Sequence, residues 1–337
     1  MKFLGLRLCE HDSNISYFDG SDVHFFKSER YKKSKHHAYD SFESWIDEIK
    51  DIWNLEPQDL DEIGIVFDPW RYRLNSEDDN FFPTKKFNYL PYNITRINHH
   101  YAHALSCWPI SNTCQKHFVF DGFGDYNIYW SYIENDKLKD FCNLHTDTHN
   151  YVSLGHVTDQ LAQAMNINVK SVYDLSGKLM GLQAYGNLDE KYLNKLQKFD
   201  IHLMGAAFEY SLWEQHCGDT LLAQHKKLDW ARTLHHWAGE ALVKYFAKYA
   251  DYDEEISFSG GCAQNVVWNY HIKSFFKNLV VFPHCNDEGL SLGCVEFLRQ
   301  LNNQPKFKKD NYPFWQTDIA PKKNPSEKTI KETAQDL

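Results

Sequence analysis

The chain opens with three short apolar runs separated by polar turns. Lys2–Leu8, Asn14–Phe18 and Val23–Phe26 are rich in aliphatic and aromatic residues, which predicts three strands. Cys9–Ser13 is a polar turn between the first two strands, and Asp19 with the glycine that follows it is typical of a hairpin turn. The opening pattern is therefore strand, polar turn and hairpin.

The same pattern returns later in the chain. His117–Phe120 predicts a buried strand, Asp121–Tyr126 a glycine-containing polar turn, and Asn127–Ile133 with Leu138–Phe141 a hairpin. Each copy is followed by segments of helical period. Two such copies indicate an internal duplication and an α/β protein of two similar lobes. The unit resembles the one that opens each lobe of the actin, sugar-kinase and heat-shock-protein-70 class, whose lobes are ribonuclease-H-like and whose active site lies in the cleft between them.

Hydrophobic patterns predict the remaining strands and helices of both lobes. Further strands are predicted at Glu62–Phe67, Ile94–Ile97, Ile256–Phe258 and Leu279–Phe282, and further helices at Tyr39–Asn54, His156–Asn166, Asp229–Tyr249 and Leu292–Leu301. Asp68–Pro91 has no clear period and is expected to be a surface excursion. We expect the first lobe at 1–112, the second at 113–303 and a tail at 304–337, with Tyr312–Trp315 as a docking patch.

Composition narrows the functional classes. The 337 residues carry a net charge of −10, which argues against a general nucleic-acid-binding surface but leaves room for a local basic groove around Lys32–Lys35. No run of 18 apolar residues occurs, so we expect no membrane span. The eight cysteines include no Cys-x-x-Cys pair, and the N-terminus lacks a signal-peptide pattern. These features favour a cytoplasmic protein with reduced thiols.

The first candidate for chemistry is the run Asn-His-His-Tyr-Ala-His-Ala that begins at Asn98. On a helix, His99 and His103 lie one turn apart on the same face, which suits a two-imidazole metal clamp. The alternative is two helix histidines bonded to water or backbone. His100 points to another face and is expected to be a packed or hydrogen-bonded histidine.

Two glycine-containing runs are candidates for ligand contact. Ser176–Gly186 places glycines around Lys178, which suits close backbone approach to a ligand with Lys178 as a phosphate or carboxylate partner, although the spacing is not that of a Walker loop. The alternative for this run is a glycine-containing surface loop. Gly260 and Gly261 follow a predicted strand and precede a helix, an arrangement that can hold adenosine or phosphate at a helix N-terminus, although a double glycine by itself is a weak signal.

Taken together, the motifs resemble the O-carbamoyltransferase family of antibiotic and nodulation-factor biosynthesis, over the N-terminal domain that is similar to the tRNA threonylcarbamoyl transferase. The matches are His11-Asp12-Ser13, Glu29-Arg30 with Lys35-His36, His-His-x-x-His-Ala at 99–104, Asp-Gly-x-Gly-Asp at 121–125, Gly-Lys-Leu-Met-Gly-Leu-x-x-Tyr-Gly at 177–186, Gly-Gly-x-Ala-x-Asn at 260–265 and Asp-x-Gly at 287–289. They run in order through nearly the whole of 1–301.

The resemblance implies one Fe²⁺, or another divalent metal, held by His99, His103, Asp121 and Asp287. Two imidazoles and two carboxylates suit divalent iron that keeps open positions. The family transfers a carbamoyl group from carbamoyl adenylate, made from ATP and carbamoyl phosphate, to an alcohol. The metal would bind adenylate oxygens and polarise the carbamoyl carbonyl.

The resemblance also implies roles for other residues. His11 would contact the carbamoyl group or take the hydroxyl proton, and Asp12 would orient it, although both also suit an ordinary turn. Asp125 is either a support for the metal site or turn chemistry. The residues expected to hold the nucleotide are Lys35, Lys178, Gly181, Gly260, Gly261 and Asn265.

Several partners and readings stay open. The acceptor is a sugar or other small-molecule alcohol, or 5-hydroxymethylcytosine in phage-type DNA. The YrdC-like domain that makes carbamoyl adenylate in the family has no signature here, so a separate adenylating subunit is one expectation, and a homodimer is also open. The alternatives are a tRNA threonylcarbamoyl transferase-like enzyme and a catalytically silent nucleotide-binding scaffold of the same fold.

Overall fold

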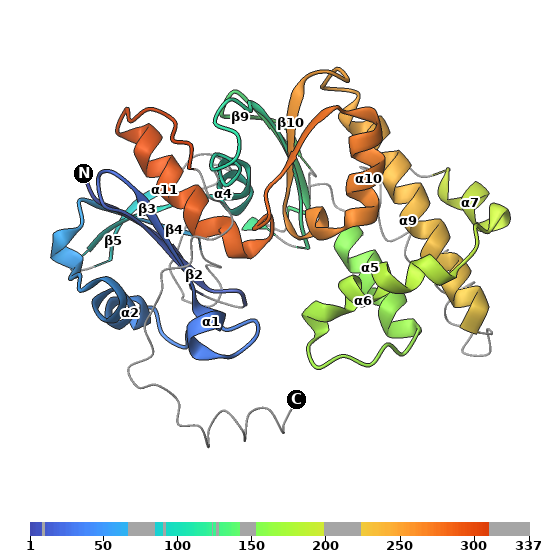
Figure 1. Ribbon diagram of the computed structural model, residues 1–337, viewed down its shortest axis with the longest axis horizontal. Helices are drawn as coiled ribbons and strands as arrows, with labels where there is room; N and C mark the ends of the chain where they lie inside the picture. Colours follow the sequence, from blue (N-terminus) through green and yellow to red (C-terminus); the bar gives the residue numbers. More distant parts are fainter. Residues whose placement is uncertain are drawn as a thin grey trace.

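The computed structural model describes residues 1–8, 11–66, 85–89, 92–122, 124–125, 128–141, 153–198 and 224–309. Two β-sheets with helices packed on them form the body of the molecule (Figure 1). The predicted docking patch Tyr312–Trp315 lies outside the described residues. None of the described helices has the length and apolar character needed to cross a membrane.

The first sheet has six strands in the order β3-β2-β1-β4-β6-β5. Their bounds are β1 Phe3–Arg7, β2 Asn14–Phe18, β3 Val23–Lys27, β4 Glu62–Val66, β5 Lys85–Tyr89 and β6 Tyr92–Arg96. β1, β2 and β3 form an antiparallel meander, while β4 and β6 continue the sheet in parallel with β1. β5 then pairs antiparallel with β6 at the edge.

The second sheet repeats this topology without the extra edge strand. Its order is β11-β10-β7-β8-β9, with β7 Lys116–Phe120, β8 Trp130–Glu134, β9 Lys137–Phe141, β10 Glu255–Ser259 and β11 Asn278–Val281. β7, β8 and β9 form the antiparallel meander, and β10 and β11 add the two parallel strands. The prediction of two similar α/β lobes is confirmed.

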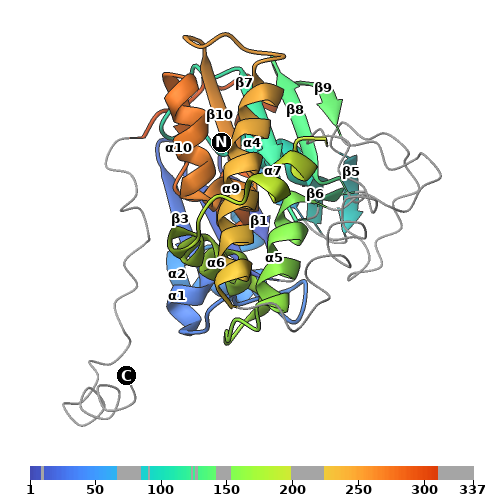
Figure 2. The ribbon, with the colours of Figure 1, turned by 90° about the vertical axis from the view of Figure 1, so that its right-hand side faces the viewer.

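Helices cover both sheets. Their bounds are α1 Ser28–Lys32, α2 Ser44–Trp53, α4 His99–Leu105, α5 Leu154–Ala164, α6 Leu175–Leu182, α7 Glu190–Leu196, α9 Gln224–Phe246, α10 Val266–Phe275 and α11 Leu290–Leu301, with short 3₁₀ turns η1 Pro57–Asp59, η3 Val172–Asp174, η4 Gln183–Tyr185, η6 Gly261–Gln264 and η7 Asp287–Gly289. α2 packs Trp45 and Ile49 onto the first sheet. α9 and α10 lie over the second sheet (Figure 2), where Phe246 stacks on Phe118.

Two helices cross between the lobes. α11, which falls in the range predicted for the second lobe, packs on β1, β2 and β4 of the first sheet and also against α4. The approach is close because β1 has a glycine here: a Cβ on Gly5 would lie 2.1 Å from the Ser291 carbonyl oxygen. α4 in turn contacts β7, β8 and β10 of the second sheet. The predicted lobe boundary stays a prediction. Because α4 and α11 pack against each other and each contacts a sheet, they join the two sheets.

Two segments contain regular elements that the sequence did not predict. A surface loop was the alternative reading of Ser176–Gly186, but α6 and η4 occupy 175–185. Leu175 and Leu179 form an apolar helix stripe whose burial outweighs the cost of about 1 kcal/mol for each helical glycine. The excursion predicted over Asp68–Pro91 contains β5, an edge strand that main-chain pairing holds without a clear alternation in its sequence.

Candidate metal centre

The start of α4 is fixed by two side chains. The Asn98 side-chain oxygen accepts a hydrogen bond from the Tyr101 N–H at 3.2 Å and so caps the helix. Asp125 accepts from the His99 N–H at 2.8 Å and pairs with Arg96 at 2.9 Å. Asp125, in the turn that follows β7, therefore fixes the start of the helix on which the two histidines lie.

His99 and His103 point their Nε2 atoms at the same two carboxylates. The Oδ2 atom of Asp121 lies 3.0 Å from His99 Nε2 and 2.8 Å from His103 Nε2. The Oδ1 atom of Asp287 lies 3.4 Å from each of these nitrogens, which are themselves 3.1 Å apart. Three separate parts of the chain thus bring together four buried ligand atoms, from the four residues that the family resemblance implies.

The spacing of these atoms fits a single small cation. Ligand atoms about 2.0–2.1 Å from one ion are separated by about 3.0 Å at a right angle and about 3.4 Å at a tetrahedral angle. The measured separations of 2.8 to 3.4 Å fall in this range. A set of two imidazoles and two carboxylates is suited to a divalent transition metal. The residues present therefore fit the metal that the resemblance implies.

The charges of the cluster reinforce one another. Burial alone lowers the pKa of His99, but the negative charges of Asp287 and Asp121 outweigh it and raise that pKa to about 10. Burial favours the neutral form of Asp287, but Arg7 and the two histidines hold its pKa well below the usual value. Arg7 donates to Asp287 Oδ2 at 2.6 Å, and both side chains are buried. Asp287 is therefore ionised and ready to bind a cation.

His100 behaves as predicted for a packed histidine. Its Nδ1 lies 2.9 Å from the Ser131 hydroxyl, and burial lowers its pKa to about 3. Its ring fills the space beside Gly124, where a Cβ would lie 2.3 Å from the ring carbon Cδ2. His100 is neutral and supports the fold beside the cluster.

His11 lies at the edge of the cluster. Its Nδ1 is 2.9 Å from Asp12 Oδ2, and its Nε2 is 3.9 Å from Asp287 Oδ2. Burial lowers the pKa of His11, but the hydrogen bond to Asp12 and the charge of Asp287 outweigh that effect and raise it. The His11 side chain is still 24% exposed, whereas the Asp12 side chain is only 5% exposed. His11 is thus oriented by Asp12 and accessible from outside.

The contacts of Asp12 extend to the second lobe. Asp12 Oδ1 lies 2.9 Å from His36 Nδ1, and His36 Nε2 lies 3.5 Å from Asp174 in η3. Lys35 also pairs with Asp174. Tyr173 covers this corner, with ring centroids 4.3 Å from His11 and 5.3 Å from His36. The predicted cofactor role of Lys35 stays a prediction, and the structure gives its ammonium a carboxylate partner.

The double glycine lies against the Asp121 turn. Gly260 has a positive φ of 88°, and a Cβ there would lie 2.1 Å from the Phe120 carbonyl oxygen. A Cβ on Gly261 would lie 3.0 Å from Asp121 Oδ1. Asn265 caps α10 by accepting from the Val267 and Trp268 N–H groups. Their role in nucleotide binding remains a prediction, but the glycines allow β10 to approach Asp121.

Lys178 and Gly181 lie on α6 rather than in a loop. Lys178 is exposed, and a Cβ added at Gly181 would have no heavy atom within 4 Å. The structure therefore gives the backbone at Gly181 no steric need for glycine. The predicted contact of these two residues with the nucleotide remains untested.

Sequence reasoning missed several residues of this region. Arg7 could have been found as a lone charge inside an apolar strand, because a fully buried arginine needs an ionic partner. Asn14 joins the turn to the second lobe, with its side-chain amide donating to the Asp287 carbonyl oxygen at 2.8 Å. Tyr173 and Asp174 offered no signal, because only the tertiary structure brings η3 to the first lobe.

Comparison with known proteins places these features in context. The family model described as "Carbamoyltransferase N-terminus" matches residues 84–295. That range contains all four candidate ligands, His99, His103, Asp121 and Asp287. It begins after His11, Asp12 and Lys35. No curated protein sequence matches the chain.

Solved structures share the fold at low identity. Full-length HypF in its phosphate- and nucleotide-bound form has a TM-score of 0.59 and 12% identity, covering 91% of this chain and 47% of HypF. HypF from T. kodakarensis has a TM-score of 0.55 and 13% identity, covering 90% and 48%. The activator of 2-hydroxyisocaproyl-CoA dehydratase from Clostridium difficile, with bound ADPNP, has a TM-score of 0.53 and 13% identity, covering 95% and 100%. The chain spans about half the length of HypF.

Proposed function

Because the chain belongs to the carbamoyltransferase N-terminus family and is a carbamoyltransferase, we propose that it moves a carbamoyl group from carbamoyl adenylate to a hydroxyl acceptor, with a divalent metal, Fe²⁺ in the first instance, at the four-residue cluster. The observation that carries the proposal is the convergence of His99, His103, Asp121 and Asp287 beside a partly exposed histidine. A nucleotide-binding scaffold would have no need of such a set.

His99, His103, Asp121 and Asp287 would hold the metal. When bound, the metal supplies Lewis-acid polarisation of a carbonyl or phosphoryl oxygen. Arg7 keeps Asp287 ionised through a buried contact at 2.6 Å. Asp125 fixes the first turn of α4, so that both imidazoles keep their direction.

His11 is proposed to take the proton from the acceptor hydroxyl. Asp12 accepts the Nδ1–H of the neutral ring, which leaves Nε2 as the base on the side of Asp287. A raised pKa makes this imidazole a stronger base. Tyr173 covers one side of the ring and would limit water access while an acceptor is bound.

The nucleotide of the carbamoyl adenylate is proposed to lie along the second lobe, near Gly260, Gly261 and Asn265, with Lys178 and Gly181 of α6 and Lys35 as further contacts. Two of the similar solved structures hold a nucleotide or a nucleotide analogue, which supports this choice. Carbamoyl adenylate would be made from ATP and carbamoyl phosphate, and a YrdC-like partner is the proposed source.

For the acceptor we favour a small-molecule alcohol, such as a sugar, over a hydroxymethylated base in DNA. Two lysines of the basic stretch have carboxylate partners, Lys32 with Glu48 at 2.5 Å and Lys35 with Asp174. These contacts reduce the positive charge offered to a phosphate backbone, and the net charge of the chain is −10.

The first test is metal content after anaerobic purification. Stoichiometric iron in the wild type, lost in His103→Ala and Asp287→Asn, is the expected result. His235→Ala is a matched control, because His235 is equally buried but lies on α9 outside the cluster. Absence of metal from the wild type, even after Fe²⁺ is added, would contradict the mechanism and favour the silent scaffold.

The second test is transfer from synthetic carbamoyl adenylate, which removes the need for a partner. Carbamate formation on an alcohol, with release of AMP, is expected. Release of AMP only when threonylcarbamoyl adenylate and tRNA are supplied would instead favour the threonylcarbamoyl transferase-like alternative.

A further inference from the structure

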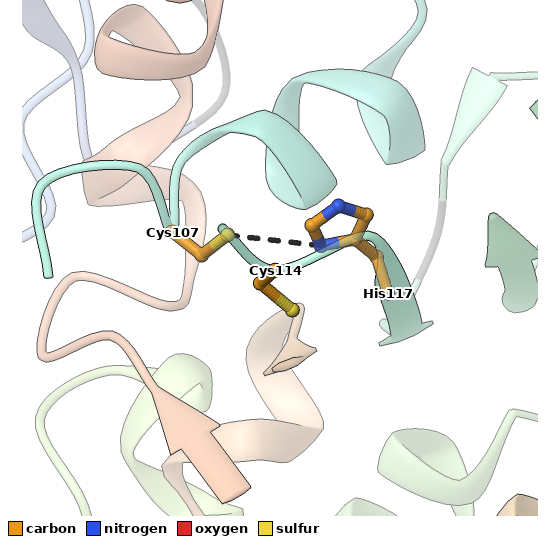
Figure 3. A group of neighbouring side chains, drawn as sticks. All are labelled: Cys107, Cys114 and His117. Carbon is orange, nitrogen blue, oxygen red and sulfur yellow. Dashed lines mark hydrogen bonds between the residues drawn. The ribbon is translucent and has the colours of Figure 1, made fainter. Parts of the chain in front are cut away.

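A second buried cluster lies near the other end of α4. Cys107 follows the helix by two residues, Cys114 lies on the same connection, and His117 is the second residue of β7. All three side chains are buried, and their ligand atoms all lie within 4.8 Å of one another. Figure 3 shows the three neighbouring side chains and the contact between the Cys107 thiol and the His117 ring.

The separations suit a metal bound by sulfur and nitrogen. Cys107 Sγ lies 3.7 Å from His117 Nδ1. A tetrahedral ion with a sulfur at about 2.3 Å and a nitrogen at about 2.0–2.1 Å would separate those ligands by about 3.6 Å. The two thiols also interact with each other, and each makes long contacts with carbonyl oxygens: 3.9 Å from Cys107 to Ser111, and 3.5 and 3.8 Å from Cys114 to Lys116 and Glu255.

The scaffold around these side chains is fixed without a metal. Glu255 at the start of β10 accepts from the hydroxyls of Ser111 at 2.6 Å and Thr113 at 2.7 Å, so the connection is tied to the sheet. His117 pairs in register with Ser257 of β10, and the Ser257 hydroxyl lies 2.7 Å from His117 Nδ1. The ligand atoms therefore need little ordering to bind an ion, and the Ser257 hydroxyl oxygen lies close enough to be a fourth ligand atom.

We propose that Cys107, Cys114 and His117 form a structural Zn²⁺ site, distinct from the cluster around His99. Two thiolates and an imidazole are softer donors than two imidazoles and two carboxylates, so the two clusters would select different ions. The bound ion would join the C-terminal end of α4 to β7 and β10. It would thereby steady the helix whose other end carries His99 and His103.

Cobalt binding tests the proposal, because only a site with sulfur ligands gives a thiolate-to-cobalt charge-transfer band. The full chain would be stripped with chelator under reducing conditions and titrated with Co²⁺, followed by displacement with Zn²⁺. We expect the band in the wild type and in His103→Ala, which lacks the other cluster. Loss of the band is expected in Cys107→Ser and in Cys114→Ser.

Cys294→Ser is the matched control, since Cys294 is also buried but lies on α11 outside the cluster. His117→Gln keeps both sulfurs and is expected to weaken Zn²⁺ binding in competition with a chelator. No band in the folded wild type would overturn the proposal, as would a band that survives in both cysteine variants. A Cys107–Cys114 disulfide that forms in air, in a chain that never gives the band when reduced, would assign the pair to redox chemistry instead.

Discussion

The turn after β1 and the turn after β7 occupy the same place in two sheets of the same topology, but their side chains differ in kind. The first turn carries His11 and Asp12, a partly exposed imidazole with a carboxylate partner. The second carries Asp121 and Asp125, two buried carboxylates directed at α4. The duplicated topology brings both turns to one junction, where we propose proton transfer for the first turn and metal binding for the second, which also supports α4 through Asp125.

The packing behind the two turns differs as well. α11 packs on β1 so closely that only a glycine fits at position 5. The buried Arg7 at the end of β1 pairs with Asp287. β7 is backed by stacked aromatic rings such as Phe118 and Phe246. The first lobe thus supplies a buried cation to Asp287, whereas the second lobe supports its turn with packed aromatic rings. Four predictions test this division.

The largest expected effect is on transfer activity. Asp121→Asn is expected to abolish both metal binding and carbamoyl transfer, whereas His11→Asn should keep the metal and lower the rate by about 10²–10⁴-fold. Metal analysis and turnover with carbamoyl adenylate would be measured on the same preparations. His24→Asn is the control, a half-exposed histidine paired with Asp19 in the first lobe. Loss of metal in His11→Asn would break the proposed division between the two turns.

The second effect is on stability. Arg7→Ala removes the buried guanidinium that donates to Asp287 and is expected to lower the free energy of unfolding by about 3–5 kcal/mol, as measured in urea without metal. Adding Asp287→Asn should recover part of that loss, because the uncompensated charge is gone. An Arg7→Ala protein as stable as the wild type would show that the histidines alone balance Asp287.

The third effect is the pH dependence of the metal-free protein. The pKa of His99 is raised from 6.5 to about 10 in the fold, so the stability from its ion pairs is complete below pH 6.5. It should fall as the pH rises toward 10. Thermal melts in chelator would follow it. With a divalent metal added, the trend should weaken or reverse, because the metal needs the neutral imidazole. A His99→Gln variant should lose this dependence.

The smallest expected effect is that of a substitution on α6, which tests whether this helix contacts the nucleotide. Gly181→Ala has free space for its Cβ and sits in a helix, so it should raise the free energy of unfolding by roughly 0.5–1 kcal/mol. If transfer activity is unchanged, the backbone at this position does not contact the nucleotide. A lower activity in a more stable protein would support the predicted contact and extend the ligand site from the second turn to α6.

Much of the fold could be predicted because its signals are local. Alternating and continuous apolar runs predicted ten of the strands to within a few residues, since each such run must bury its side chains wherever the sheet lies. The repeat of strand, turn and hairpin predicted the duplication. The exceptions were β5 and α6, where main-chain pairing and a stripe of leucines outweighed a weak or glycine-rich local pattern.

The sequence by itself determined the kinds of ligand, the helical spacing of His99 and His103, and the pairing of a histidine with an aspartate at 11 and 12. Only the tertiary structure decided which distant groups meet them. Three side-chain contacts join residues that are far apart in the sequence: Arg7 with Asp287, His36 with Asp174, and His117 with Ser257. Such contacts have no periodic signature, because the crossing of α4 and α11 between the lobes and the register of parallel strands set them.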